Sequence, residues 1–256
     1  MTVLVDIGNT RIKWATLAGG RLVEPGSAVH RDSLDTAVAA FDAALPARAV
    51  RVIAANVAGE PVAARLRALV AARPGASLEL VAPSAERFGV RCAYAEPSTL
   101  GVDRWVAVLA AHHAARGAAC VIDAGTAVTF DAVDSSGAHL GGLIFPGARL
   151  LATALDRDTS NIGSTAPAPS VPRGLELLGR STDAAVGHGA LLALAAALDR
   201  AAVTVARALG TTPVVYLTGG DADTLRGWLE TRVELRADLV LEGLALFESS
   251  RAEAGS

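Results

Sequence analysis

The chain has 256 residues, of which 52% are apolar and only 4% aromatic, and its formal net charge is −3. This length suits one large domain or two smaller ones with a core of Ala, Val and Leu. Interspersed acids and bases give no electrostatic reason to expect nucleic acid or a membrane surface as a partner. Two cysteines are too few for a disulfide framework or a zinc site, so we expect a reduced, cytoplasmic protein.

The first half of the chain predicts strands followed by helices. After an apolar run at residues 3–5, its expected elements are a hairpin across residues 18–21, a helix near 33–45, a strand at 49–55, a helix at 61–72, a strand at 78–81 and a helix at 103–116. These assignments follow from apolar periodicity and from the turn residues that separate the segments.

The second half repeats that order. We expect a strand at 118–122, a strand pair at 128–133 and 138–145, a short helix after Pro146, a surface loop at 157–173, a long apolar helix at 181–209, a strand at 214–217, a loop at 218–222 and a final helix from Asp238. A meander of strands followed by strands that alternate with helices predicts an α/β fold with mixed sheets flanked by helices. We divide the chain into an N-terminal lobe, 1–116, and a C-terminal lobe, 117–256.

Two segments, Asp6-Ile-Gly-Asn-Thr10 and Asp123-Ala-Gly-Thr-Ala-Val-Thr129, share one pattern and open the two halves. Each places an acid at the end of a strand, followed by glycine and hydroxyl residues. Glycine lets backbone N–H groups approach phosphates, hydroxyls add donors, and the carboxylate can hold a cation or its waters. The pair predicts a duplicated nucleotide-binding architecture that holds phosphates between two lobes. Alternatively, both acids cap their own turns.

Lys13 lies just beyond the first of these loops and is the single lysine among 23 basic residues. A chain that uses arginine for its other positive charges would keep a lysine where a phosphate needs a compact point charge. A chance remnant on an exposed strand face explains the lysine equally well.

The turn-rich segment 94–104 delivers Asp103 and Arg104 to the start of a predicted helix. Aspartate is a favoured N-cap, and an arginine beside it can simply be solvated. The functional interpretation is a carboxylate base for a hydroxyl substrate, with an arginine that binds an anionic group. Phosphoryl transfer needs little more from a protein than such positioned charges.

Taken together and in this order, the motifs of the chain resemble those of type III pantothenate kinases. They are Asp6-x-Gly-Asn-Thr10, Gly101-Val-Asp-Arg104, Asp123-x-Gly-Thr-Ala-x-Thr129, Gly141-Gly-x-Ile-x-Pro-Gly147, Leu178-Gly-Arg-Ser-Thr182 and Leu217-Thr-Gly-Gly-Asp-Ala222. The resemblance implies duplicated ribonuclease-H-like lobes of the sugar kinase, Hsp70 and actin superfamily. It also implies ATP-dependent phosphorylation of the primary hydroxyl of pantothenate to 4′-phosphopantothenate, the first step of coenzyme A biosynthesis.

The resemblance also implies a role for individual residues. Asp103 matches the proton acceptor, and Asp123 matches the ligand of a monovalent cation, K⁺ or NH₄⁺, while Asp6 would hold Mg²⁺ through water. The substrate site comprises Tyr94, Gly101, Val102, Asp103, Arg104 and Thr182. The ATP site comprises Asp6, Gly8, Asn9, Thr10, Arg11, Lys13 and Thr126, with an adenosine-type loop at 218–222. Lys13 and the stretch Ala54-Ala-Asn-Val57 depart from the family pattern, which leaves the roles of Lys13 and Asn56 open.

Two other classes of function remain as alternatives. One is an ATP-driven binding module of the actin or chaperone kind, and the other is a non-catalytic ATP-binding regulatory or accessory protein of the same fold.

We also expect a homodimer, because the helix at 181–209 is apolar on nearly every face and needs cover from its own lobe or from a second subunit. The resemblance places Thr182 near the substrate of the neighbouring subunit, and a charge at Ala190 or Leu191 would test this seam.

Overall fold

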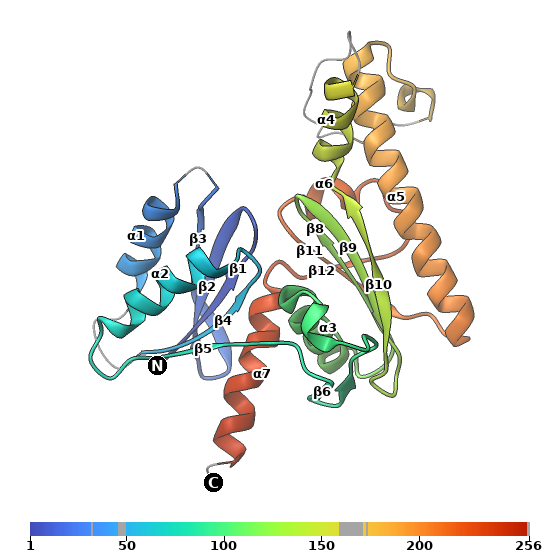
Figure 1. Cartoon of the computed structure of the whole chain (residues 1–256). Coiled ribbons are helices and arrows are strands. Elements are labelled where there is room, and N and C mark those ends of the chain that lie inside the picture. The colour runs from blue at the N-terminus through green and yellow to red at the C-terminus, as the bar shows by residue number, and fades with distance from the viewer. Residues whose placement is uncertain (32, 46–49, 159–170, 173, 255–256) are drawn as a thin grey trace. The chain divides into compact units, whose positions relative to one another are not determined.

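The computed structural model describes residues 1–31, 33–45, 50–158, 171–172 and 174–254. Its chain forms two compact units, Met1–His113 together with Asp238–Ser256, and Ala114–Ala237. The final helix groups with the first unit, whereas the division at residue 116 assigned it to the second lobe. Each unit holds a five-stranded mixed sheet with helices beside it (Figure 1), which confirms the predicted α/β class.

The sheet of the first unit has the spatial order β3-β2-β1-β4-β5. Its strands are β1 (Thr2–Ile7), β2 (Arg11–Ala18), β3 (Arg21–Val29), β4 (Arg51–Asn56) and β5 (Ser77–Leu80). The first three pair antiparallel, and β1, β4 and β5 pair parallel. The predicted hairpin at 18–21 is confirmed, and Gly19 and Gly20 both have positive φ, as a tight two-residue hairpin turn requires.

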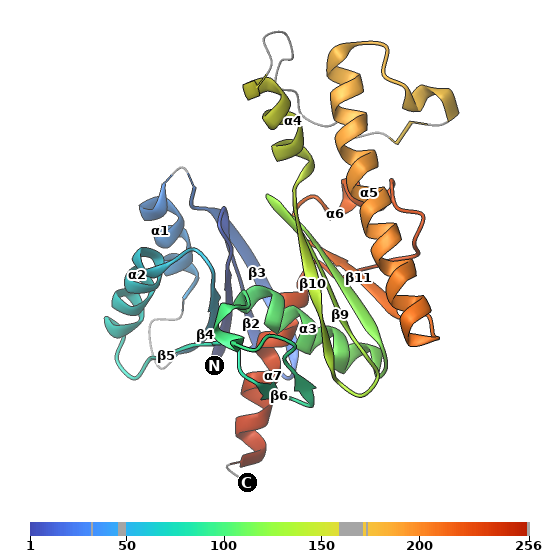
Figure 2. The same ribbon diagram turned by 45° about the vertical axis from the view of Figure 1, so that its right-hand side comes forward.

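Helices cover both faces of this sheet (Figures 1 and 2). On one face, α1 (Leu34–Ala44) and α2 (Glu60–Ala71) bury Phe41 and Leu66 against Val5 and Val52. Ser33 caps α1, because its hydroxyl accepts the N–H of Thr36 at 3.2 Å. On the other face, α7 (Leu239–Ala254) lies along β1, and Glu248 accepts a hydrogen bond from Thr2 at 2.9 Å.

After β5, the chain of the first unit continues to α3 (Val102–Ala115). A small hairpin of β6 (Glu86–Arg87) and β7 (Val90–Arg91) and a 3₁₀ turn, η1 (Pro97–Thr99), precede the helix. The ring of Phe88 meets Phe247 of α7 edge-on at 4.9 Å, and the Arg87 guanidinium lies over both rings. These contacts fix the hairpin on α7.

The second unit repeats the strand pattern of the first. Its sheet has the order β10-β9-β8-β11-β12, with strands β8 (Ala119–Ala124), β9 (Ala127–Val133), β10 (His139–Pro146), β11 (Val214–Thr218) and β12 (Glu234–Leu235). The first three again pair antiparallel and the last two parallel. Cys120 lies in the core of this sheet, where burial raises the pKa of its thiol to about 12, so that it remains a neutral apolar residue.

The long helix α5 (Thr182–Leu209) packs one face on this sheet and exposes the other. Leu191, Leu194 and Leu198 are buried in the core cluster. Leu192 and Val203, on the other face, are 44% and 41% exposed, so the unit's own core does not bury the helix all round. By length and composition α5 could cross a membrane, but its buried leucines show that it is a core helix of this unit.

Shorter elements complete the second unit. They are α4 (Ala148–Asp158), the 3₁₀ turn η2 (Gly174–Leu177) and α6 (Ala222–Arg226). The surface loop expected at 157–173 lies for the most part outside the described residues.

Candidate active site

The first phosphate-type loop is the turn that joins β1 to β2. Asp6, one residue before the end of β1, lies directly opposite Lys13 of β2, and both side chains are half-buried. The N–H of Gly8 donates to the carbonyl of Arg11 at 3.1 Å, which closes the turn, and Asn9 is exposed at its tip. The structure therefore gathers all the residues predicted for this loop in one hairpin. Lys13 lies beside an acid and not on a fully exposed strand face.

Asn56, whose role the sequence left open, shapes the chain that leads into α2. Its side-chain amide donates to the carbonyl of Gly59 at 2.9 Å, and its side-chain oxygen accepts the N–H of Ala58 at 3.0 Å. Both ends of the amide therefore serve a local turn.

The second phosphate-type loop joins β8 to β9, at the equivalent place in the second sheet. Asp123 is half-buried and faces Thr129 in the ladder, with Thr218 of β11 on its other side. The N–H of Gly125 donates to the carbonyl of Ala127 at 3.1 Å and closes this turn. Thr126 lies at its tip and is half-buried.

Two glycines allow neighbouring backbone to approach this second loop. A Cβ on Gly147 would lie 2.4 Å from the carbonyl oxygen of Gly125, and one on Gly219 would lie 2.2 Å from that of Ala124. Gly219 also has φ of 98°, a conformation that other residues rarely adopt. The N–H groups of Gly147 and Asp221 donate to the carbonyls of Thr126 and Ala124, each at 2.9 Å. Glycine at positions 147 and 219 thus lets both segments pack closely against the second loop.

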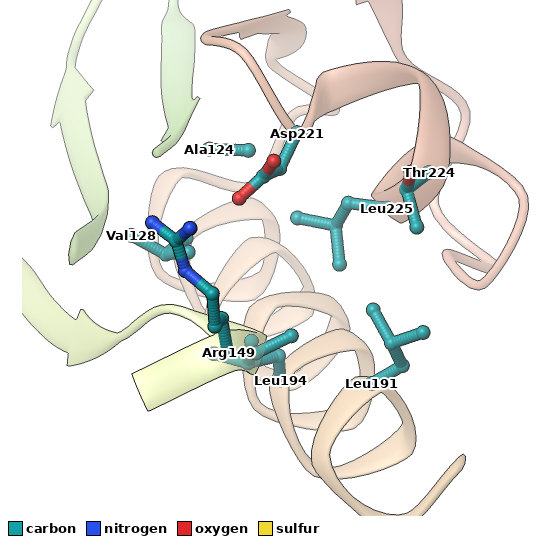
Figure 3. Close-up of a pocket in the computed structure, with 9 residues that line it drawn as sticks. Ala124, Val128, Arg149, Leu191, Leu194, Asp221, Thr224 and Leu225 are labelled. Atoms are coloured by element: carbon teal, nitrogen blue, oxygen red, sulfur yellow. The ribbon is translucent and has the colours of Figure 1, made fainter. Parts of the chain in front are cut away.

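A pocket of about 260 Å³ opens beside this second loop (Figure 3). Its lining residues are Ala124, Val128, Ala148, Arg149, Leu191, Leu194, Asp221, Thr224 and Leu225. Figure 3 shows the carboxylate of Asp221 and the guanidinium of Arg149 turned toward each other at one side, with leucines across from them. The pocket therefore combines an apolar wall with two charged groups, as small-molecule sites commonly do.

Asp221 presents its carboxylate to this pocket and not to its own helix. It occupies the N-cap position of α6, but its side chain makes no capping hydrogen bond. Burial raises the pKa of Asp221, and the positive charge of Arg149 offsets part of that effect. The sequence motif at 217–222 included Asp221 without assigning it a role. The sequence predicted no role for Arg149, because α4 comes to lie beside that motif only in the folded chain.

The segment 94–104 brings its predicted residues together in the first unit. Arg104 is only 8% exposed, and its guanidinium donates to the hydroxyl of Tyr94 at 3.2 Å. The carboxylate of Asp103 accepts the N–H of Arg104 at 2.8 Å and remains half-buried. A Cβ on Gly101 would lie 2.6 Å from that carboxylate, so glycine leaves room for it.

The structure does not fit the two alternative interpretations of this segment. The helix α3 begins at Val102, and the N–H of Trp105 donates to the carbonyl of Gly101 at 3.0 Å. Asp103 therefore lies in the first helical turn and is not the N-cap. Arg104 is buried and bonded to Tyr94, so it is not a solvated surface charge.

Thr182 is the first residue of α5 in the second unit, where it is exposed beside the capping residue Ser181. The hydroxyl of Ser181 accepts the N–H of Ala184 at 3.2 Å. Capping therefore occupies Ser181, while the side chain of Thr182 faces solvent.

The acids at the two loops do not form a protein cage for a metal. Within the described residues, no group of three or more His, Cys, Asp or Glu side chains could hold a metal ion. Magnesium commonly binds one or two carboxylates together with substrate phosphates and waters. The single half-buried carboxylate at each loop, Asp6 and Asp123, fits a cation held in that shared manner.

Solved structures of other proteins share the fold of this chain. A Baf family protein from Campylobacter jejuni superimposes with a TM-score of 0.58 at 17% identity, covering 98% of this chain and 99% of that one. An inorganic polyphosphate/ATP-glucomannokinase from Arthrobacter superimposes with a TM-score of 0.50 at 17% identity, covering 98% of both chains. At such identities the likeness shows the fold alone, an α/β architecture with mixed sheets flanked by helices.

Sequence comparison identifies the family within that class. The family model described as type III pantothenate kinase matches residues 2–204. A type III pantothenate kinase of Nitrosococcus oceani is 36% identical over 250 residues, which cover 96% of this chain and 92% of the relative. One of Alkalilimnicola ehrlichii is 39% identical over 248 residues, covering 95% of this chain and 96% of the relative. The chain belongs to the type III pantothenate kinase family.

Proposed function

We propose that this protein transfers the γ-phosphoryl group of ATP to the primary hydroxyl of pantothenate, which yields 4′-phosphopantothenate in the first step of coenzyme A biosynthesis. Family membership makes it a kinase and transferase of this pathway. The observation that carries the proposal for this chain is the segment 94–104. There a half-buried carboxylate, a buried arginine and a tyrosine hydroxyl are linked through Arg104.

Asp103 is the proposed general base of the reaction. Its carboxylate accepts the proton of the pantothenate hydroxyl as that oxygen forms a bond to the γ-phosphorus and the bond to the β-phosphate oxygen breaks. The products are ADP and the phosphate ester. Because the backbone N–H of Arg104 already donates to Asp103, this carboxylate has a defined orientation before substrate binds.

Arg104 and Tyr94 are proposed to bind pantothenate, whose carboxylate is an anion that a guanidinium recognises well. The hydrogen bond between Arg104 and Tyr94 holds both side chains in one arrangement. Gly101 and Val102 complete this wall of the acceptor site, and the exposed Thr182 is proposed as a further pantothenate contact.

The two turns at the strand ends are proposed to bind the phosphates of ATP. The first contributes Asp6, Gly8, Asn9, Thr10, Arg11 and Lys13, and the second contributes Thr126. The pocket beside the second turn is proposed to take the nucleoside, with Leu191 and Leu194 against the base and Asp221 as acceptor for hydroxyl groups of the sugar.

A divalent cation accompanies ATP in kinases, and we propose Mg²⁺ held by Asp6 through water. When bound, it would neutralise negative charge that develops on the phosphate oxygens. For Asp123 we propose a monovalent cation, K⁺ or NH₄⁺, because its half-buried carboxylate lies between the hydroxyl-bearing residues Thr129 and Thr218 in the sheet. The two acids thus have separate proposed tasks.

We further propose a cytoplasmic homodimer. The outer face of α5 exposes Ala185, Leu192, Ala193, Ala196 and Val203, and the edge strand β10 exposes Leu143 and Ile144. Apolar stripes of this kind commonly mark subunit interfaces.

The experiment that tests the proposed function is an ADP-release assay on the purified protein. With ATP, Mg²⁺, K⁺ and pantothenate together, we expect steady ADP production that stops when pantothenate is omitted. ADP release that is independent of pantothenate would favour an ATP-driven binding module. No release under any condition would favour a non-catalytic accessory protein.

A further inference from the structure

His30 follows β3 and contacts the first phosphate-type turn at two points. Its ring Nε2 lies 2.7 Å from the carbonyl oxygen of Gly8, and its backbone N–H donates to the carbonyl of Thr10 at 2.9 Å. A carbonyl oxygen can only accept, so the ring presents Nε2–H to Gly8. His30 therefore donates hydrogen bonds to the carbonyls of Gly8 and Thr10, the two residues on either side of Asn9.

This contact sets the direction of a backbone donor. A trans peptide is planar, and its C=O and N–H point in opposite directions. Because the carbonyl of Gly8 faces His30, the N–H of Asn9 points to the opposite side of the turn. Asn9 is exposed at the tip of the turn.

Two backbone hydrogen bonds hold the base of the turn. The N–H of Val57 donates to the carbonyl of Ile7 at 3.0 Å, and the N–H of Gly8 donates to that of Arg11 at 3.1 Å. The peptide between Gly8 and Asn9 is held through its oxygen by His30. Since Gly8 has no Cβ, its backbone can adopt other orientations readily when that bond is absent.

We propose that His30 is a positioning residue for the nucleotide phosphates, acting through the bond from its Nε2–H to the carbonyl of Gly8. The bond orients the Gly8–Asn9 peptide so that the N–H of Asn9 is directed at the bound phosphate before ATP arrives. This inference rests on the proposed function, because the anion is taken to be ATP. His30 itself contacts neither phosphate nor acceptor, and it is not a catalytic residue.

Three substitutions of His30 distinguish the effect of its hydrogen bond from the effect of its side-chain size. His30→Leu keeps a side chain of similar size without a donor, and His30→Gln offers an amide N–H at about the reach of Nε2. His30→Asn keeps an amide whose donor falls short of that position, so it should behave like the leucine variant. His113→Leu, at an exposed histidine of α3, is the matched control.

We expect His30→Leu and His30→Asn to raise the KM for ATP roughly 3- to 10-fold, the usual effect of one lost hydrogen bond. The KM for pantothenate and the kcat should stay within about twofold, by the same scale. His30→Gln should restore the KM for ATP, and His113→Leu should change nothing. Hydrogen exchange of residues 8–11 in the nucleotide-free protein should accelerate in the leucine and asparagine variants only.

The inference is wrong if His30→Leu leaves the KM for ATP unchanged, or if the glutamine variant is as impaired as the leucine one. It is also wrong if both KM values rise and kcat falls together with the melting temperature. If His30→Leu does not fold, the contrast between asparagine and glutamine decides in the same way. A parent protein that does not phosphorylate pantothenate would refute the proposed function instead. The hydrogen exchange of residues 8–11 would still decide the role of His30.

Discussion

At the scale of single residues, Asp103 and Arg104 have different surroundings although they are neighbours in the chain. Arg104 is buried and its guanidinium is bonded to Tyr94, so its position is defined by the fold. Asp103 remains half-buried and is oriented by the N–H of Arg104. An accessible carboxylate beside a fixed cation is what a base for an anionic alcohol requires.

Replacing Asp103 with Asn tests this assignment. The amide keeps the size of the side chain but cannot accept the hydroxyl proton, so we expect kcat to fall on the order of 10²- to 10⁴-fold. The melting temperature and the KM for ATP should be close to those of the parent. Steady-state kinetics that place kcat within about threefold of the parent would exclude Asp103 as the base.

Asp221 allows a prediction in which stability and function change in opposite directions. Desolvation raises its pKa in the folded protein, so the folded state holds this proton more tightly than the unfolded state. Stability therefore falls as the pH rises from the ordinary pKa of aspartate through the raised value, and the cost persists at neutral pH. Replacing Asp221 with Asn removes that cost.

We expect Asp221→Asn to melt at or above the temperature of the parent at pH 7, with the difference vanishing in acid. The KM for ATP should rise about tenfold, because a charged acceptor for the sugar hydroxyls is lost. Melting curves between pH 4 and 8 and ATP titrations measure both effects. A variant that is less stable at pH 7 and has an unchanged KM for ATP would contradict the assignment.

At the scale of elements, α5 shows why a buried helix and an interface helix look alike in sequence. Its inner face packs Leu191 and Leu194 on the sheet, whereas Leu192 and Val203 are exposed. An apolar sequence on all sides does not say which side meets the core. The structure makes Ala190 and Leu191 unsuitable for testing a subunit seam, since both are buried in the unit's own core.

Two adjacent leucines now form a matched pair for the proposed dimer. Leu192→Asp places a charge on the exposed stripe, so it should convert the dimer to monomer with little change in melting temperature. Leu191→Asp buries an unpaired charge and should destabilise the fold itself. Light scattering and thermal melting separate these effects. A parent protein with the mass of the 25.9 kDa monomer would contradict the proposed dimer. An intact dimer in Leu192→Asp would show that the exposed face of α5 is not the subunit interface.

The long elements and the two loops could be predicted from sequence because each carries its own signal. Continuous apolar runs marked the strands β1 and β8, and glycine with an acid marked the turns after them. The two-residue strands β6 and β12 are too short to show any period. The sheet that α7 covers, the orientation of Asp221 and the approach of Arg149 depend on packing between distant segments, which no local pattern contains.

At the scale of the whole molecule, the chain uses one unit architecture twice with different additions. Both sheets have the same spatial order of strands. In each sheet a phosphate-type turn joins the two strands that come first in the chain, β1 and β2 or β8 and β9. The first unit adds the segment 94–104, which carries the proposed acceptor chemistry. The second unit adds α4 and α5, which line the proposed nucleoside pocket. The proposed acceptor residues thus belong to one unit and the proposed nucleoside pocket to the other.

The proposed cation at Asp123 predicts a dependence on salt identity. Replacing K⁺ with Na⁺ or tetramethylammonium, at constant ionic strength and constant Mg²⁺, should reduce turnover strongly in the parent. Asp123→Asn should be slow in every salt. Equal parent rates in the three salts would assign Asp123 another task, such as water-mediated contact with Mg²⁺.

The most direct test of the central claim is the identity of the product. The protein is incubated with ATP, Mg²⁺, K⁺ and pantothenate, and the mixture is analysed by mass spectrometry beside an Asp103→Asn control. We predict a new species with the mass of pantothenate plus one phosphoryl group, phosphorylated at the primary hydroxyl and nearly absent in the control. Unmodified pantothenate after extended incubation with the parent protein would contradict the account.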